Sequence, residues 1–87
     1  MDLAESLLRQ LDDLTLSHGE RVLIQCEISA DFEHRGQYEA ARDALGGLWR
    51  GVGQRPSLEG LTDRTAAEVL LRTGALAGWL ASIAQDE

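Results

Sequence analysis

Several residue types are scarce in this 87-residue chain, and each scarcity excludes a class of protein. Lysine is absent, so all eight basic residues are arginine, and fifteen acidic residues leave a formal net charge of −7. That charge argues against sequence-independent binding of nucleic acid or of an anionic lipid surface, because both need clustered positive charge. The chain does not open with a basic stretch followed by an apolar run, so we expect no signal peptide.

The chain has one cysteine, Cys26, and therefore cannot contain an internal disulfide. A single thiol is typical of a reducing compartment, and we expect a cytoplasmic location. Proline occurs once and aromatic residues make up 5% of the chain, whereas leucine and alanine are abundant. These proportions favour helices. We predict an all-α fold of four antiparallel helices, and a single domain over residues 1–87.

Apolar residues at helical spacing indicate two helices in the first half of the chain. The first is expected over residues 2–16 and the second over about residues 20–34. Ser17 precedes the second helix and Glu20 follows three residues later, which is the spacing of a capping box. Gly36 is expected to end this helix, because glycine readily adopts the left-handed conformation found after helix ends.

A third helix is expected to begin at Tyr38, so that its joint with the second helix is very tight. Gly46 and Gly47 end it and begin the longest connection in the chain. Thr62 or Asp63 is then placed to cap a last helix over about residues 63–84.

The last helix is apolar on nearly all sides and must therefore be covered on more than one side. Between residues 65 and 84 its only charged residues are Glu68 and Arg72, an i,i+4 pair. The charge-free run over residues 73–84 is shorter than the roughly 20 residues that a bilayer requires, so we predict no membrane span. Gly74 and Gly78 predict tight packing against a neighbouring helix.

A stretch across the second and third helices resembles a tetratricopeptide repeat. The resemblance lies in Ile28-Ser29-x-x-Phe32-x-x-x-Gly36-x-Tyr38-x-x-Ala41-x-x-x-Leu45. The sequence departs from the family pattern at Gln25, at Leu48 and in the displaced Pro56. The last helix looks like the first helix of a further repeat, with Leu80-Ala81 as its large–small pair.

The resemblance implies a non-enzymatic interaction module that binds a protein or peptide segment and needs no cofactor. The binding surface of such repeats is lined by their first helices, which here implies Leu23, Cys26, Ala30, Glu33 and His34. Helical repeats bury their faces only by stacking, and about three or more are normally required. We therefore expect the chain to be an N-terminal fragment of a longer protein, a subunit of a homo-oligomer, or both.

The alternative interpretation is a self-assembly domain that forms a homodimer through the apolar last helix. A C2 dimer is the commonest closed solution for such a surface. The candidate self-association residues are Leu71, Gly74, Gly78, Trp79, Leu80 and Ile83.

Candidate chemistry is sparse. Glu27, Asp31 and His34 share one helical face and could converge on a divalent metal, but a solvated polar face is the preferred interpretation. Cys26 is expected to be a buried, inert thiol, and His18 a surface residue in a turn. Nucleotide-binding and hydrolase motifs are absent from the sequence. We predict no catalytic residue, no metal site and no enzymatic activity.

The two tryptophans, Trp49 and Trp79, are expected to pack between helices, with a role as binding anchors as the alternative.

Overall fold

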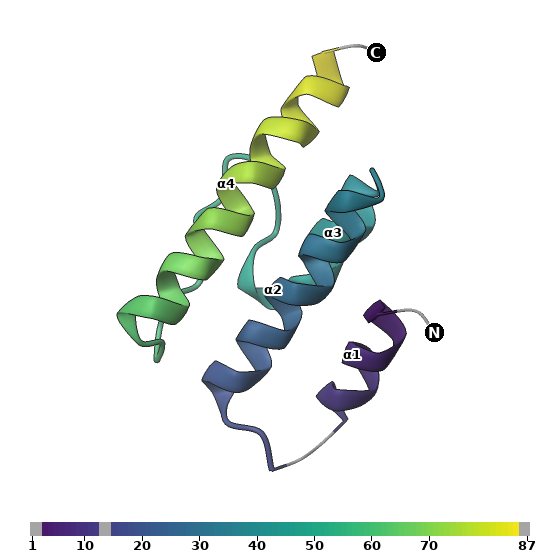
Figure 1. Cartoon of the computed structure of the whole chain (residues 1–87). Coiled ribbons are helices and arrows are strands. Elements are labelled where there is room, and N and C mark those ends of the chain that lie inside the picture. Colours follow the sequence, from purple (N-terminus) through teal and green to yellow (C-terminus); the bar gives the residue numbers. More distant parts are fainter. Residues whose placement is uncertain (1–2, 13–14, 86–87) are drawn as a thin grey trace.

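The computed structural model describes residues 3–12 and 15–85, which form four α-helices and one 3₁₀ turn and contain no β-strand (Figure 1). The helices are α1 (Leu3–Leu11), α2 (His18–His34), α3 (Tyr38–Ala44) and α4 (Asp63–Gln85), and the 3₁₀ turn η1 (Gly46–Leu48) follows α3. The predicted all-α fold class is confirmed.

Helix α1 is shorter than predicted. It ends at Leu11, so the expected extension through Thr15 and Leu16 is wrong; the predicted positions 2, 13 and 14 lie outside the described residues. The Nη1 atom of Arg21 in α2 donates to the Leu11 carbonyl oxygen at 2.7 Å. In a continuing helix that carbonyl would accept from the backbone N–H of residue 15. A side chain ten positions away therefore takes over a bond that the helix needs to continue.

Helix α2 has the capping box expected from the sequence. The Glu20 backbone N–H donates to Ser17 Oγ at 3.1 Å, and the Ser17 N–H donates to Glu20 Oε1 at 3.2 Å. Because the cap precedes the first helical residue, α2 begins at His18, two positions before the predicted start.

The end of α2 is a Schellman motif, in which a left-handed residue turns the chain out of the helix. Gly36 has the left-handed φ of +75°. The backbone N–H of Gly36 donates to the Glu33 carbonyl and that of Gln37 to the Phe32 carbonyl, both at 2.9 Å. The joint between α2 and α3 is therefore as tight as predicted.

Helix α3 stops at Ala44, and η1 continues its buried side as a 3₁₀ turn. Ala41, Leu45 and Leu48, which follow one another at three- and four-residue spacing, are all buried. Trp49 follows with only 3% of its surface exposed, and its Nε1 donates to the Gln54 carbonyl at 3.0 Å. The indole thus anchors the long connection to the core, as the packing interpretation of Trp49 predicts.

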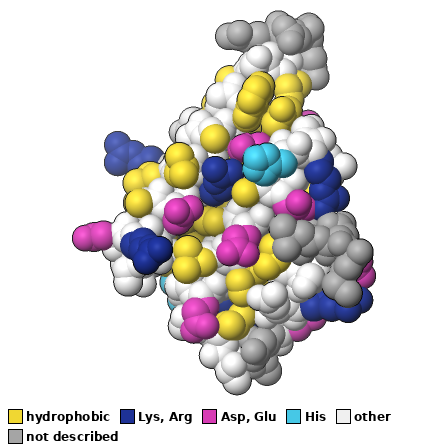
Figure 2. Space-filling view, in the orientation of Figure 1, with side chains coloured by type: hydrophobic (Ala, Val, Ile, Leu, Met, Phe, Trp, Pro, Cys, Tyr) yellow, Lys and Arg dark blue, Asp and Glu magenta, His cyan; other side chains and the backbone are white. Residues whose placement is uncertain are grey.

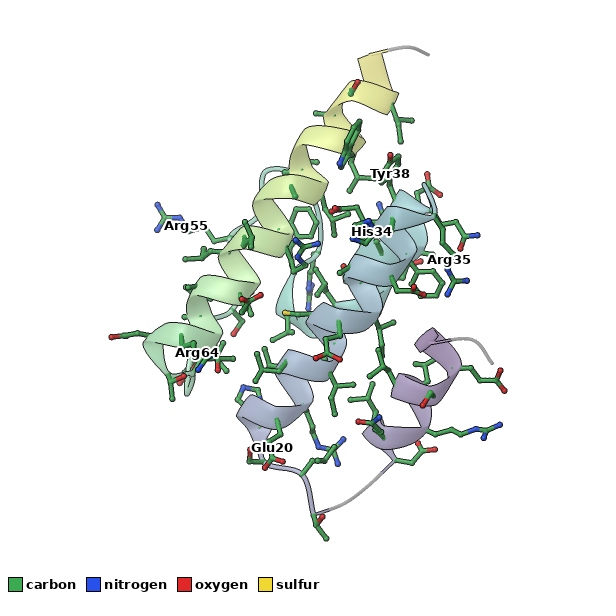
Figure 3. All side chains as sticks on the ribbon, in the orientation of Figure 1. Glu20, His34, Arg35, Tyr38, Arg55 and Arg64 are labelled. Carbon is green, nitrogen blue, oxygen red and sulfur yellow. The ribbon has the colours of Figure 1, made fainter. Side chains whose placement is uncertain are left out.

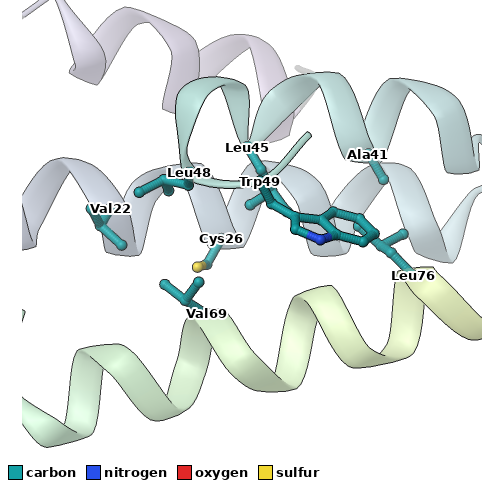
Figure 4. Packing of buried hydrophobic residues seen from close by; sticks show 8 residues of the cluster. All are labelled: Val22, Cys26, Ala41, Leu45, Leu48, Trp49, Val69 and Leu76. Carbon is teal, nitrogen blue, oxygen red and sulfur yellow. The ribbon is translucent and has the colours of Figure 1, made fainter. Parts of the chain in front are cut away.

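The core lies between α2, α3 and α4 (Figure 4). A smaller cluster joins Leu7 of α1 to Ile28 of α2. The chain measures 43 × 32 × 17 Å, and a helix with its side chains is about 10–12 Å across. The main cluster comprises Val22, Cys26, Ala41, Leu45, Leu48, Trp49, Val69 and Leu76.

Helix α4 lies beside α2, and the two run in the same direction in Figure 1. Thr62 caps it, since its Oγ1 accepts from the Thr65 backbone N–H at 3.3 Å. Val69 and Leu76 are fully buried against the core. The opposite side, which includes Leu70 and Leu71, is exposed, so the part of the chain that the structure describes covers α4 on one side only.

By length and composition alone, the segment Asp63–Ile83 of α4 is also long and apolar enough to cross a membrane. The charge-free run of residues 73–84 is too short to cross a membrane, but the longer segment meets the criterion even though the first half of the helix contains four charged residues. One such helix is weak evidence, since core helices of soluble proteins meet the same criterion.

Candidate functional site

A groove of about 410 Å³ runs between α2 and α4 and is the main candidate site. Helix α2 contributes residues at positions 23, 26, 27 and 30, and α4 contributes positions 64, 68 and 72. Both sets follow the three- and four-residue spacing of one helical face, so the groove follows from packing two helices side by side. Figure 3 shows side chains of both helices projecting into the space between them. The lining residues are Leu23, Cys26, Glu27, Ala30, Arg64, Glu68 and Arg72.

The groove combines an apolar floor with a charged rim. Leu23, Cys26 and Ala30 form the floor, and two glutamates and two arginines surround it. Figure 2 shows acidic, basic and hydrophobic side chains intermingled on this face, without a large area of one sign. Such a lining suits an apolar side chain flanked by polar groups better than it suits a highly charged polymer.

An ion pair lies beside one end of the groove. Arg72 Nη1 of α4 lies 3.5 Å from Glu33 Oε2 of α2, and both side chains are mostly buried, at 18% and 15% exposed. The sequence suggests Glu68 as the partner of Arg72, but in the structure the arginine reaches across to α2. The second carboxylate oxygen of Glu33 is buried and has no hydrogen-bond partner among the described residues. The pair therefore links the two helices while leaving one acceptor unsatisfied.

Cys26 lies at the floor of the groove and contributes to the core. Burial raises the pKa of its thiol from 9.0 to about 11, and the nearby carboxylate of Glu68 adds to this rise. The thiolate is the reactive form of cysteine, so a raised pKa makes this residue a poor nucleophile at neutral pH. The prediction of a buried, unreactive thiol agrees with this environment.

The five residues predicted to bind a partner fall into two groups. Leu23, Cys26 and Ala30 line the groove. Glu33 lies beside it in the ion pair with Arg72, and His34 is exposed and is not part of the lining. The sequence reasoning missed the α4 side of the groove. The available signal was the spacing of Arg64, Glu68 and Arg72 by four residues.

The six residues predicted for self-association do not share one face. Leu71, Gly74 and Gly78 lie on the exposed side of α4, but Leu80 is partly buried against the core. The expectation that Gly74 and Gly78 pack tightly is wrong within the chain. A Cβ atom built at either position meets no neighbouring atom within 4 Å.

Trp79 and Ile83 lie toward the start of α3 instead. The Trp79 ring stacks on Tyr38, with centroids 5.1 Å apart and an angle of 11° between the ring planes. Trp79 therefore packs between helices, as predicted, while remaining 49% exposed. Ile83 lines a second hollow of about 390 Å³ with residues 36–40.

The polar face of α2 does not assemble a metal site. Asp31, at the centre of the candidate set with Glu27 and His34, forms an ion pair with Arg35. Within the part of the chain that the structure describes, no group of three or more His, Cys, Asp or Glu side chains could hold a metal ion. His18 is exposed, as predicted, but it is the first residue of α2, so its expected place in a turn is wrong.

Comparison with known proteins identifies no relative: no family model, no curated protein sequence and no solved structure matches this chain.

Proposed function

We propose that this chain is a non-enzymatic protein-interaction module, arranged like a tetratricopeptide repeat, that binds a peptide segment of a partner in the groove between α2 and α4. The groove supports this proposal because its apolar floor and charged rim have the composition of a specific binding site. The sequence resemblance supports it independently, since three residues of the face that it implies, Leu23, Cys26 and Ala30, line the groove.

Charge indicates the chemistry of the bound segment. The Arg72 guanidinium is paired with Glu33, so its charge is largely neutralised. Glu27, Glu68 and Arg64 remain on the rim, which leaves an acidic balance in a chain whose net charge is already −7. A segment with one apolar side chain for the floor and an adjacent lysine or arginine for the rim would complement this surface. The charge would also exclude acidic competitors.

Selection from a displayed library of random peptides would test the proposal even though the partner is unidentified. Enriched peptides would be synthesised with a fluorescent label and titrated by anisotropy with the wild type and two variants. Glu68→Arg reverses a charge on the rim of the groove. Glu59→Arg makes the same change in the connection before α4, at an exposed position that does not line the groove. Both variants shift the net charge equally, so only local complementarity distinguishes them.

We expect enriched peptides to pair an apolar residue with a basic one. Glu68→Arg should weaken their binding by about tenfold, equivalent to about 1.4 kcal/mol, and Glu59→Arg should leave it nearly unchanged. Failure to enrich any peptide on the wild type would contradict the proposal. Equal binding to both variants would place the peptide site elsewhere on the molecule and would also reject it.

A further inference from the structure

A second surface, separate from the groove, lies on the outer face of α4. We define this face as Ala67, Leu70, Leu71, Gly74, Gly78 and Ser82, all of which are exposed. Leu70 and Leu71 are 50% and 58% exposed, which places two large apolar side chains together in solvent. Between Ala67 and Ser82 this face contains no charged residue, in a chain in which 26% of residues are charged.

We propose that the outer face of α4 docks against the same face of a second copy of this chain, with the two α4 helices antiparallel about a two-fold axis near Gly74. This inference goes beyond the proposed peptide site and does not depend on it. Helix α4 is apolar around most of its circumference, yet the only buried residues of its Asp63–Ile83 segment are Thr65, Val69, Thr73 and Leu76. A helix of that composition requires cover on a second side.

The distribution of charge favours a second copy in the antiparallel orientation. All the charged residues of α4 lie between positions 63 and 72, and none lies between 73 and 85. An antiparallel pair sets the charged half of each helix beside the uncharged half of its partner, whereas a parallel pair sets like charges side by side. Two copies of net charge −7 repel each other, so a charge-free face is the least unfavourable place for them to meet.

The ends of the helices add to this complementarity. The last turn of α4 has no basic residue of its own. In the antiparallel pair, Arg64 of each copy lies near the C-terminal end of the partner helix. A cation in that position interacts favourably with the partial negative charge of the helix end.

Shape and size are also compatible with self-pairing. About a two-fold axis near Gly74, residues that precede Gly74 in one copy contact residues that follow it in the other copy. Leu70 and Leu71 precede Gly74 by about one turn, and Gly78 follows it by one turn, so the bulky residues of each copy meet the small residue of the other. Nothing else within the described part of the chain occupies the space beside Gly74 or Gly78.

The available surface fits a weak, concentration-dependent dimer. Helix α4 has 23 residues and is therefore about 34 Å long. A typical interface buries about a tenth of the accessible surface of each small protein. Each copy has an accessible surface of 5767 Å², so the two copies together would bury about 1,150 Å², just above the lower limit for a biological contact. The outer face from Ala67 to Ser82 spans about 22 Å of the helix, so reaching that area also requires contacts from side chains that flank the face.

Sedimentation equilibrium from micromolar to millimolar concentration tests association directly. The wild type should move from 9.5 kDa toward twice that mass. Leu71→Glu places a charge on the outer face and should raise the midpoint concentration by about tenfold or more. Leu8→Glu is the matched control, because Leu8 is 51% exposed on α1, and it should leave the midpoint unchanged. Circular dichroism checks that each variant is helical, and Ser82→Glu replaces Leu71→Glu if the latter is unfolded.

Disulfide cross-linking tests the orientation. Gly74→Cys lies near the proposed axis and should form a covalent dimer on mild oxidation. Ala67→Cys should not, because the two copies of residue 67 would lie about 21 Å apart along an antiparallel pair. The native Cys26 is buried and does not compete. Equal cross-linking of both variants would indicate a parallel pair and overturn the proposed geometry.

Three results would overturn the proposal itself. The first is a monomer at every concentration. The second is an equal loss of association in Leu71→Glu and Leu8→Glu. The third is a monomer that sediments with neutral phosphatidylcholine vesicles and loses this binding in Leu71→Glu, because lipid would then cover the face. Each of these results leaves the peptide titrations at the groove unaffected, so the two proposals fail independently.

Discussion

Replacing Gly74 by alanine should stabilise the monomeric chain, which is unusual for a substitution in a packed helix. Gly74 lies near the middle of α4, and the structure gives it a helical backbone without a positive φ. A Cβ atom added there meets nothing within 4 Å, so no strain offsets the gain in helix propensity.

The expected magnitude follows from these two observations. Glycine in a helix interior is about 1 kcal/mol less favourable than alanine, partly because alanine restricts the unfolded chain. Gly74→Ala should therefore raise the free energy of unfolding by up to about 1 kcal/mol. For a domain of this size that corresponds to an increase in Tm of about 4–8 °C. Gly78→Ala has the same open surroundings and should behave alike.

Urea unfolding followed by far-UV circular dichroism measures the effect, at a concentration where sedimentation shows a monomer. Gly46→Ala is the matched control. Gly46 has a positive φ of +54°, and its added Cβ would lie 3.5 Å from Gln25 Nε2. A left-handed conformation costs a residue with a side chain about 1–2 kcal/mol, so this variant should be destabilised.

A neutral or destabilising Gly74→Ala in the monomer would refute this reasoning. It would mean that another part of the chain lies against Gly74, and that the outer face of α4 is not open. In the proposed dimer the same methyl group separates the two helices, so Gly74→Ala should weaken association while it stabilises the monomer. Both effects in one variant would show that the same face of α4 is open in the monomer and covered in the dimer.

Three further predictions concern the core, the ion pair and the thiol. Leu45→Ala removes a fully buried side chain and should lower the free energy of unfolding by about 2–5 kcal/mol in urea titrations. The control Leu8→Ala, at a half-exposed site, should change it by about 0.5 kcal/mol or less. Arg72→Ala leaves the mostly buried carboxylate of Glu33 without its cation, so in urea titrations it should destabilise the chain more than the double change Arg72→Ala/Glu33→Gln. Equal losses would show that the unpaired carboxylate carries no penalty relative to an amide. The folded Cys26 thiol keeps its proton to a higher pH than the unfolded thiol, so its contribution to stability is intact below pH 9 and is lost as the pH rises toward 11. The free energy of unfolding of the wild type should therefore fall relative to that of Cys26→Ala between a measurement below pH 9 and one near pH 11. A constant difference would contradict the raised pKa.

The sequence by itself determined the features that depend on near neighbours along the chain. The capping box of Ser17 and Glu20, the left-handed Gly36 and the Thr62 cap all satisfy helix-end hydrogen bonds within about five residues. Their local hydrogen-bond geometry is nearly the same in any fold, so a pattern of residue types predicts them. Helix composition, the all-α class and the burial of Leu45 follow from equally local periodicity.

Tertiary structure decided what depends on distant partners. Helix α1 ends where it does because Arg21 reaches the Leu11 carbonyl, and Arg72 pairs with Glu33 because α2 packs beside α4. A nearly all-apolar helix carries little information about which of its sides will be buried. Val69 and Leu70 are adjacent apolar residues of this helix, yet Val69 is buried and Leu70 is 50% exposed. Packing against α2 decided which side of α4 forms the core and the groove, and it left the side that bears Leu70 and Leu71 in solvent. The sequence pattern of one helix could not decide this, because burial depends on two surfaces in contact.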